Sequence, residues 1–100
     1  MKTKVISERV YNQNQSWYFE RVTKINGGIT LKVSIRRNAY DCQSHAQVHK
    51  WNGDKWEVVV SAPISECECQ SISYVQSGVT KSFFEADHNR LFMEAVKIVM

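Results

Sequence analysis

The sequence predicts an α+β domain, an antiparallel β-meander of about five strands with one C-terminal α-helix packed on one face. Polar and apolar residues alternate with period two through the first two-thirds of the chain, and hairpin turn sequences separate the alternating stretches. A stripe of apolar residues with helical spacing follows near the C-terminus. Because 100 residues allow one core and no repeat or linker divides them, residues 1–100 are expected to form a single domain.

The clearest alternation runs from Ile29 to Arg36, with aliphatic residues on one face and Thr, Lys, Ser and Arg on the other. A strand from Trp17 to Ile25 precedes it, and the Asn-Gly-Gly sequence between them is a strong hairpin signal because such turns need positive φ. A two-residue turn places Glu20 opposite Val33, whereas a longer loop places Arg21 there. Either register puts one charge on the apolar face.

Three further strands are predicted at Lys4 to Tyr11, His45 to Trp51 and Trp56 to Ser61. The last two flank the turn sequence Asn-Gly-Asp-Lys, which has a tryptophan on each side. Pro63 ends the fifth strand. Residues 64–79 show no clear period, so they are expected to be mostly loop with at most a short strand.

The C-terminal stripe recurs at three- and four-residue steps and comprises Phe84, His88, Leu91, Phe92, Ala95, Val96 and Val99. Ser82 with Glu85 forms a capping-box pattern, and Asp87 is a competing N-cap. One helix covers one face of a sheet, so the other face is expected to remain open as a binding surface or a dimer interface. The open face or edge and the apolar chain end at residues 98–100 predict a homodimer.

Charge is distributed unevenly along the chain. Residues 1–50 carry nine Lys or Arg and three acids, 9 − 3 = +6, and residues 51–100 carry four and seven, 4 − 7 = −3. If the halves form different surfaces, the basic one attracts an anionic partner; if the charges interleave in the fold, no such dipole forms. The short apolar runs and the odd number of cysteines predict a soluble protein with reduced thiols in the cytoplasm.

Metal and catalytic sites are not predicted. The candidate metal ligands are Cys42, His45, His49, Cys67 and Cys69. On one strand, His45 and His49 lie about 13 Å apart, too far to share an ion. A nucleophile such as Cys42 or Cys67 near His88 lacks any supporting local signature. We therefore expect a non-enzymatic protein without metal or cofactor.

Cations and aromatic residues gather near the hairpin ends, and this combination is typical of surfaces that bind single-stranded nucleic acid. The same residue types also serve as ordinary sheet formers and as charges that keep a sheet soluble. The predicted partner-binding residues are Lys32, Arg36, Arg37, Tyr40, Trp51 and Trp56.

Residues 36–44 (RRNAYDCQS), with Trp51-Asn52-Gly53 and Lys55-Trp56, resemble a pattern in small accessory proteins encoded by bacteriophages and prophages, over about residues 30–60. The resemblance implies a binding protein that inhibits a host macromolecule, for example a defence component, in the host cytoplasm. A host protein is therefore the leading expected partner, and single-stranded nucleic acid is the alternative. It supplies no catalytic residues. From the residues alone, 36–44 is either an ordered turn between hairpins or a contact patch that includes Gln43.

Overall fold

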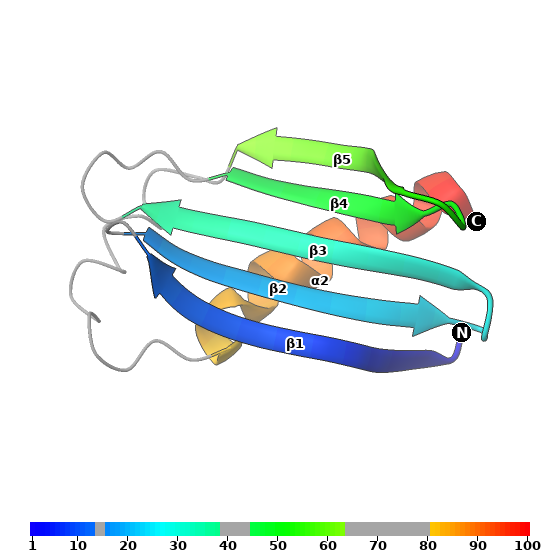
Figure 1. Ribbon diagram of the computed structural model, residues 1–100, viewed down its shortest axis with the longest axis horizontal. Coiled ribbons are helices and arrows are strands. Elements are labelled where there is room, and N and C mark those ends of the chain that lie inside the picture. The colour runs from blue at the N-terminus through cyan, green and yellow to red at the C-terminus, as the bar shows by residue number, and fades with distance from the viewer. Residues whose placement is uncertain (14–15, 39–44, 64–80) are drawn as a thin grey trace.

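The computed structural model describes residues 1–13, 16–38, 45–63 and 81–100. The predicted loop at 64–79, Tyr40, Gln43 and the three cysteines lie outside these ranges. The described elements are β1 (Thr3–Gln13), β2 (Ser16–Ile25), β3 (Ile29–Asn38), β4 (His45–Trp51), β5 (Trp56–Pro63) and α2 (Lys81–Val99). The strands form one antiparallel sheet in the order β1-β2-β3-β4-β5 with α2 against it (Figure 1), which confirms the predicted α+β meander.

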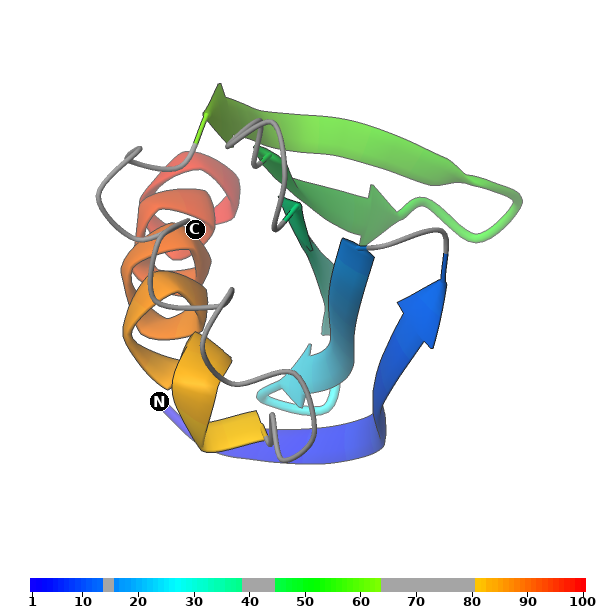
Figure 2. The same ribbon diagram turned by 90° about the vertical axis from the view of Figure 1, so that its left-hand side faces the viewer.

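The sheet curves around the helix, so that α2 lies on its concave side (Figure 2). We call this concave side the inner face and the convex side the outer face. Alternate residues of the central strands point inward and meet the apolar stripe of the helix. The buried apolar core comprises Phe19, Ile25, Leu31, Val33, Ile35, Ala46, Val48, Phe84, Leu91, Phe92 and Ala95.

The β2–β3 hairpin has the longer of the two predicted loops, the one that places Arg21 opposite Val33. Ile25 pairs with Ile29, which leaves Asn26, Gly27 and Gly28 as the loop. Asn26 has a φ of 51° and Gly27 a φ of 72°, the left-handed conformations that explain the Asn-Gly sequence. In this register Arg21, rather than Glu20, stands opposite Val33 and faces inward.

The β4–β5 turn follows the prediction at its boundaries, with Trp51 paired to Trp56 across residues 52–55. The side-chain Oδ1 of Asn52 accepts hydrogen bonds from the backbone N–H groups of Asp54 and Lys55, at 2.9 and 2.8 Å. An asparagine at this position closes the turn because its side chain satisfies backbone donors that no strand partner can reach.

Helix α2 begins at Lys81, so Ser82 stands inside the first turn and is not the residue that precedes the helix. Asp87, the other N-cap candidate, lies in the helix interior and is buried. The predicted stripe is buried or half-buried along its whole length, which confirms the expected inner surface of the helix. Among the described helices, none is long and apolar enough to cross a membrane.

Candidate functional site

The inner face holds an arginine that anchors the helix. Arg37 points inward from β3, is 2% exposed, and its Nη2 donates to Oδ2 of Asp87 on α2. Arg90, three residues further along the helix, approaches the other oxygen of Asp87 at 3.6 Å. Removing two charges from water is costly, so such a pair persists only where each charge has its partner. Arg37 therefore belongs to the sheet–helix contact and not to the molecular surface.

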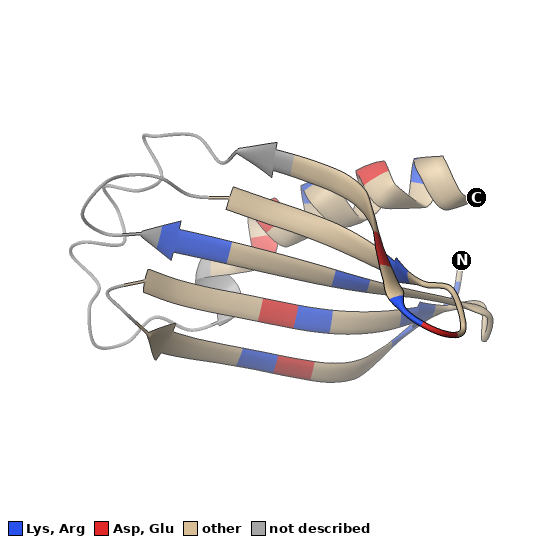
Figure 3. Ribbon diagram, turned by 45° about the horizontal axis from the view of Figure 1, so that its top comes forward, with Lys and Arg blue, Asp and Glu red and all other residues tan. Residues whose placement is uncertain are grey.

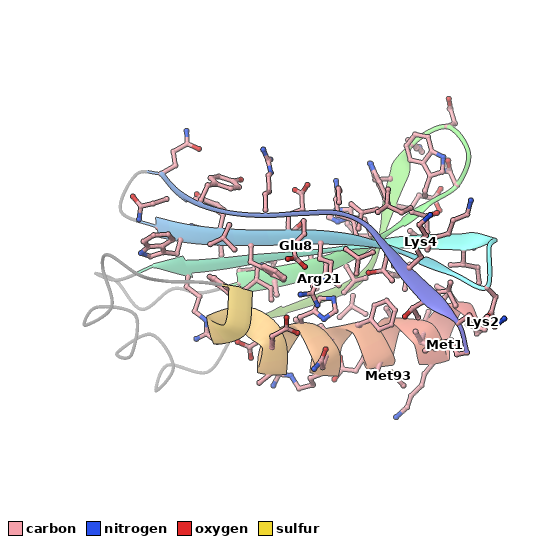
Figure 4. All side chains as sticks on the ribbon, turned by 90° about the horizontal axis from the view of Figure 1, so that it is seen from below. Met1, Lys2, Lys4, Glu8, Arg21 and Met93 are labelled. Carbon is pink, nitrogen blue, oxygen red and sulfur yellow. The ribbon has the colours of Figure 1, made fainter. Side chains whose placement is uncertain are left out.

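A second inner-face arginine joins three elements. Arg21 of β2 donates through Nε to Glu8 of β1 at 2.6 Å and through Nη2 to Glu85 of α2 at 2.6 Å. Figure 4 shows Arg21 between the sheet and the helix, with Glu8 beside it. The hydrogen bonds to Glu85 raise the pKa of Arg21, against a lowering by burial. Arg21 thereby joins the edge strand to the helix and explains why a charge occupies the apolar face.

His88 lies in the same interface. Its ring stacks on Phe92 with centroids 5.5 Å apart and meets Phe19 edge-on at 5.9 Å. Burial, reinforced by the neighbouring Arg21 cation, lowers the pKa of His88. His88 is therefore neutral at pH 7 and serves as part of the core.

Charged residues of both signs lie along β1 and β2, and basic residues lie along β3 (Figure 3). Strand alternation and register place five cations on the outer face: Lys4, Arg9, Lys24, Lys32 and Arg36. Glu20 is the one acid among the described strand residues of this face, so its net charge is 5 − 1 = +4. Arg9 approaches Glu20 at 3.9 Å, a loose and exposed ion pair that contributes little to stability. Among the described residues, the outer face is thus a basic surface.

At one end of the outer face, a row of side chains runs across four strands. The register places Tyr11, Tyr18, Arg36 and His45 side by side. The two tyrosine rings stack at 4.9 Å with 7° between their planes, and the guanidinium of Arg9 lies 4.6 Å from the centre of the Tyr11 ring. A shallow hollow of about 150 Å³ lies beside this row, and its lining also includes Glu20, Ser34 and Gln47 of the neighbouring row together with Phe19 and Ile35.

The opposite end of the outer face holds the two tryptophans. Trp51 and Trp56 meet at 5.3 Å in an edge-on arrangement, and Trp51 is 41% exposed. The ammonium of Lys32 reaches across from β3 to lie 4.6 Å from the centre of the Trp56 ring. Burial and the nearby Lys32 lower the pKa of His49, which shares this end of the face. Cation and aromatic groups therefore occur together at both ends.

Four of the predicted contact residues share the outer face, namely Lys32, Arg36, Trp51 and Trp56. Arg37 lies on the inner face, and Tyr40 lies outside the described residues. The tyrosine row and Glu20 are not among the contact residues predicted from the sequence. The sequence does contain a signal for the tyrosine row: Arg9 and Tyr11 are two residues apart on one predicted strand, and residues two apart share a face.

The described residues contain no group of three or more His, Cys, Asp or Glu side chains placed to hold one metal ion. His45 is instead hydrogen-bonded to the Ser61 hydroxyl, at 3.1 Å. A search with protein-family models gives no match, and neither curated proteins nor solved structures show significant similarity to this chain.

Proposed function

We propose that this protein is a non-enzymatic binding protein whose outer face engages single-stranded nucleic acid. The observation that carries the proposal is the pairing of cations with aromatic rings at both ends of one basic face. Proteins that bind single strands combine positive grooves for phosphates with aromatic rings on which bases stack.

The outer face is long enough to hold several nucleotides of an extended strand. His45 and Trp51 mark the two ends on β4 and are six residues apart, about 20 Å along the strand at about 3.3 Å per residue. Arg36 lies beside His45 at one end and Lys32 lies beside His49 near the other, so a strand laid along the face would bring backbone phosphates to a cation near each end. A stretch of several nucleotides spans this distance, within the range of about 4 to 16 nucleotides that small single-strand-binding domains cover.

The test is the salt dependence of binding to a fluorescently labelled strand of ten thymidines, followed by anisotropy. Each phosphate that a cation neutralises contributes about −0.7 to the slope of log affinity against log salt. If four or five outer-face cations take part, we expect a slope of about −3. Arg36→Ala is expected to weaken binding and to flatten the slope by about 0.7.

Lys97→Ala is the matched control, because it removes one positive charge from the exposed surface of α2 and leaves the outer face intact. It is expected to change neither affinity nor slope by more than a small amount. Binding that ignores salt, or that Lys97→Ala weakens as much as Arg36→Ala does, contradicts the proposal.

A host protein is the second candidate partner, and the exposed Trp51–Trp56 pair favours it because tryptophans at a hairpin tip are frequent interface anchors. This candidate matches the inhibitor that the resemblance to phage accessory proteins implies. Pull-downs from nuclease-treated host lysate, with wild type and Trp51→Ala, test it. A partner that survives nuclease and salt and is lost in Trp51→Ala supports it; recovery that depends on nucleic acid contradicts it.

A further inference from the structure

We propose that the hollow beside Tyr18 binds a guanine base, with Glu20 and Arg36 as the groups that select it. This inference rests on the proposed function, because the guanine would be an exposed base of a bound single strand. It adds to that function a preference for one base. The hollow is about 150 Å³ and opens on the outer face between β1 and β4.

Glu20 is unusual for its position. It is the one acid among the described strand residues of a face with five cations, and its nearest cation, Arg9, stays 3.9 Å away. Its side chain is 30% exposed, so the carboxylate is accessible to a ligand. An acid at this position lowers the attraction of the face for phosphate. Glu20 therefore does not serve the general electrostatic attraction of the face, and we assign it a role in contacting a ligand.

The hydrogen-bonding groups around the hollow match guanine. An ionised carboxylate only accepts hydrogen bonds, and guanine presents two adjacent donors, N1–H and the N2 amino group. Arginine only donates, and guanine O6 and N7 only accept. Within the described residues Arg36 donates through Nε to Ser16 at 3.3 Å, so its terminal nitrogens are available for a base.

The other bases fit this arrangement less well. Adenine presents an acceptor, N1, beside its amino group, and cytosine presents acceptors at N3 and O2. Thymine and uracil offer one donor, N3–H, between two carbonyl oxygens. Each would place an acceptor against the carboxylate of Glu20, which repels it.

Tyr18 supplies a surface for stacking. Tyr11 covers one side of its ring, and the register places Arg36 on the other side. A base in the hollow would stack on the face of Tyr18 that Tyr11 leaves open, with the Arg36 side chain turned aside to meet the edge of the base next to Glu20. Aromatic rings and a guanidinium are the groups on which proteins stack unpaired bases.

Two labelled strands test the inference: ten thymidines, and the same strand with guanine at its two central positions. Wild type is expected to bind the guanine strand about ten-fold more tightly, the discrimination typical of one good bidentate base contact. Glu20→Gln is expected to abolish the preference while retaining or increasing affinity for thymidine, because it removes the acid from a basic face. Glu57→Gln, an equal charge change in the exposed part of β5, is the matched control and is expected to keep the preference.

A second experiment tests whether the guanine comes from a strand or from a free nucleotide. Guanosine or adenosine monophosphate is added, and the NMR shifts of the Glu20 and Arg36 amides are followed. Guanine-selective shifts without strand binding support the hollow and overturn the proposed function. Strand binding without a guanine preference, or a preference that survives in Glu20→Gln, overturns the inference alone. Absence of both kinds of binding overturns both proposals.

Discussion

Arg36 and Arg37 are neighbours in the sequence, yet they lie on opposite faces of β3 with opposite surroundings. Arg37 is buried and paired with Asp87 of the helix. Arg36 lies on the outer face beside a shallow hollow. The two faces differ in the same way: the inner-face arginines Arg21 and Arg37 are paired with acids of other elements, whereas the outer-face cations form an accessible basic surface. The protein thus uses arginine for stability on one face and, we propose, for binding on the other.

The largest effect is expected from Arg37→Ala. Truncation leaves the buried Asp87 carboxylate without its principal partner, which costs about 3–5 kcal/mol in the free energy of unfolding. Urea denaturation measures the loss, and Arg36→Ala on the outer face is the matched control, expected to cost less than about 1 kcal/mol. If both substitutions cost the same, the distinction between the two faces fails.

Alternation and residue spacing predict the strands, both described turns and the inner stripe of the helix. The structure confirms these predictions. The sequence also predicts Arg37 as a surface contact residue, whereas the structure buries it. Alternation puts Arg36 on the polar face, but the expected strand ends there, so no local signal shows that the strand continues and turns Arg37 inward. The deciding partner, Asp87, is fifty residues away, and only the folded contact between β3 and α2 reveals it.

The next effect concerns the aromatic groups of the outer face. Trp56→Ala is expected to reduce affinity for a ten-thymidine strand by about 1–3 kcal/mol, the usual contribution of one stacked base. Trp17→Phe is a comparison on the inner face, where Trp17 packs against the core, and it should leave affinity unchanged. Anisotropy titrations measure both. Equal losses would show that stability, rather than the outer surface, governs binding.

A smaller effect is expected from pH. The fold holds the pKa of His88 below its ordinary value of 6.5, so the unfolded chain takes up the proton first as the pH falls. The stability that neutral His88 contributes is complete above about pH 6.5 and is lost progressively below it. Arg21, Glu8, Glu85 and Asn89 also face this histidine and contribute to the balance.

The free energy of unfolding is expected to fall between pH 7.5 and 5.5, and we expect His88→Gln to make this fall smaller by about 1 kcal/mol. Denaturation midpoints across this range measure the difference. An identical decline in His88→Gln and wild type would show that the inner-face histidine is not the group that titrates.

The smallest effect is expected for Arg9→Ala. The outer-face contacts of Arg9 with Glu20 and Tyr11 are exposed, so their loss is expected to change the free energy of unfolding by less than about 1 kcal/mol. Urea denaturation under the conditions used for Arg37→Ala gives the comparison. A loss above about 2 kcal/mol would mean that outer-face charges also support the fold.

The most direct test of the central claim is a map of backbone amide shifts by NMR as a ten-thymidine strand is added. We predict shifts at outer-face positions, including Tyr18, Lys32 and Arg36, with no change at Met93 and Lys97 on the solvent side of the helix. Shifts concentrated on the helix, or none at saturating strand, would contradict the assignment of the outer face as the binding surface.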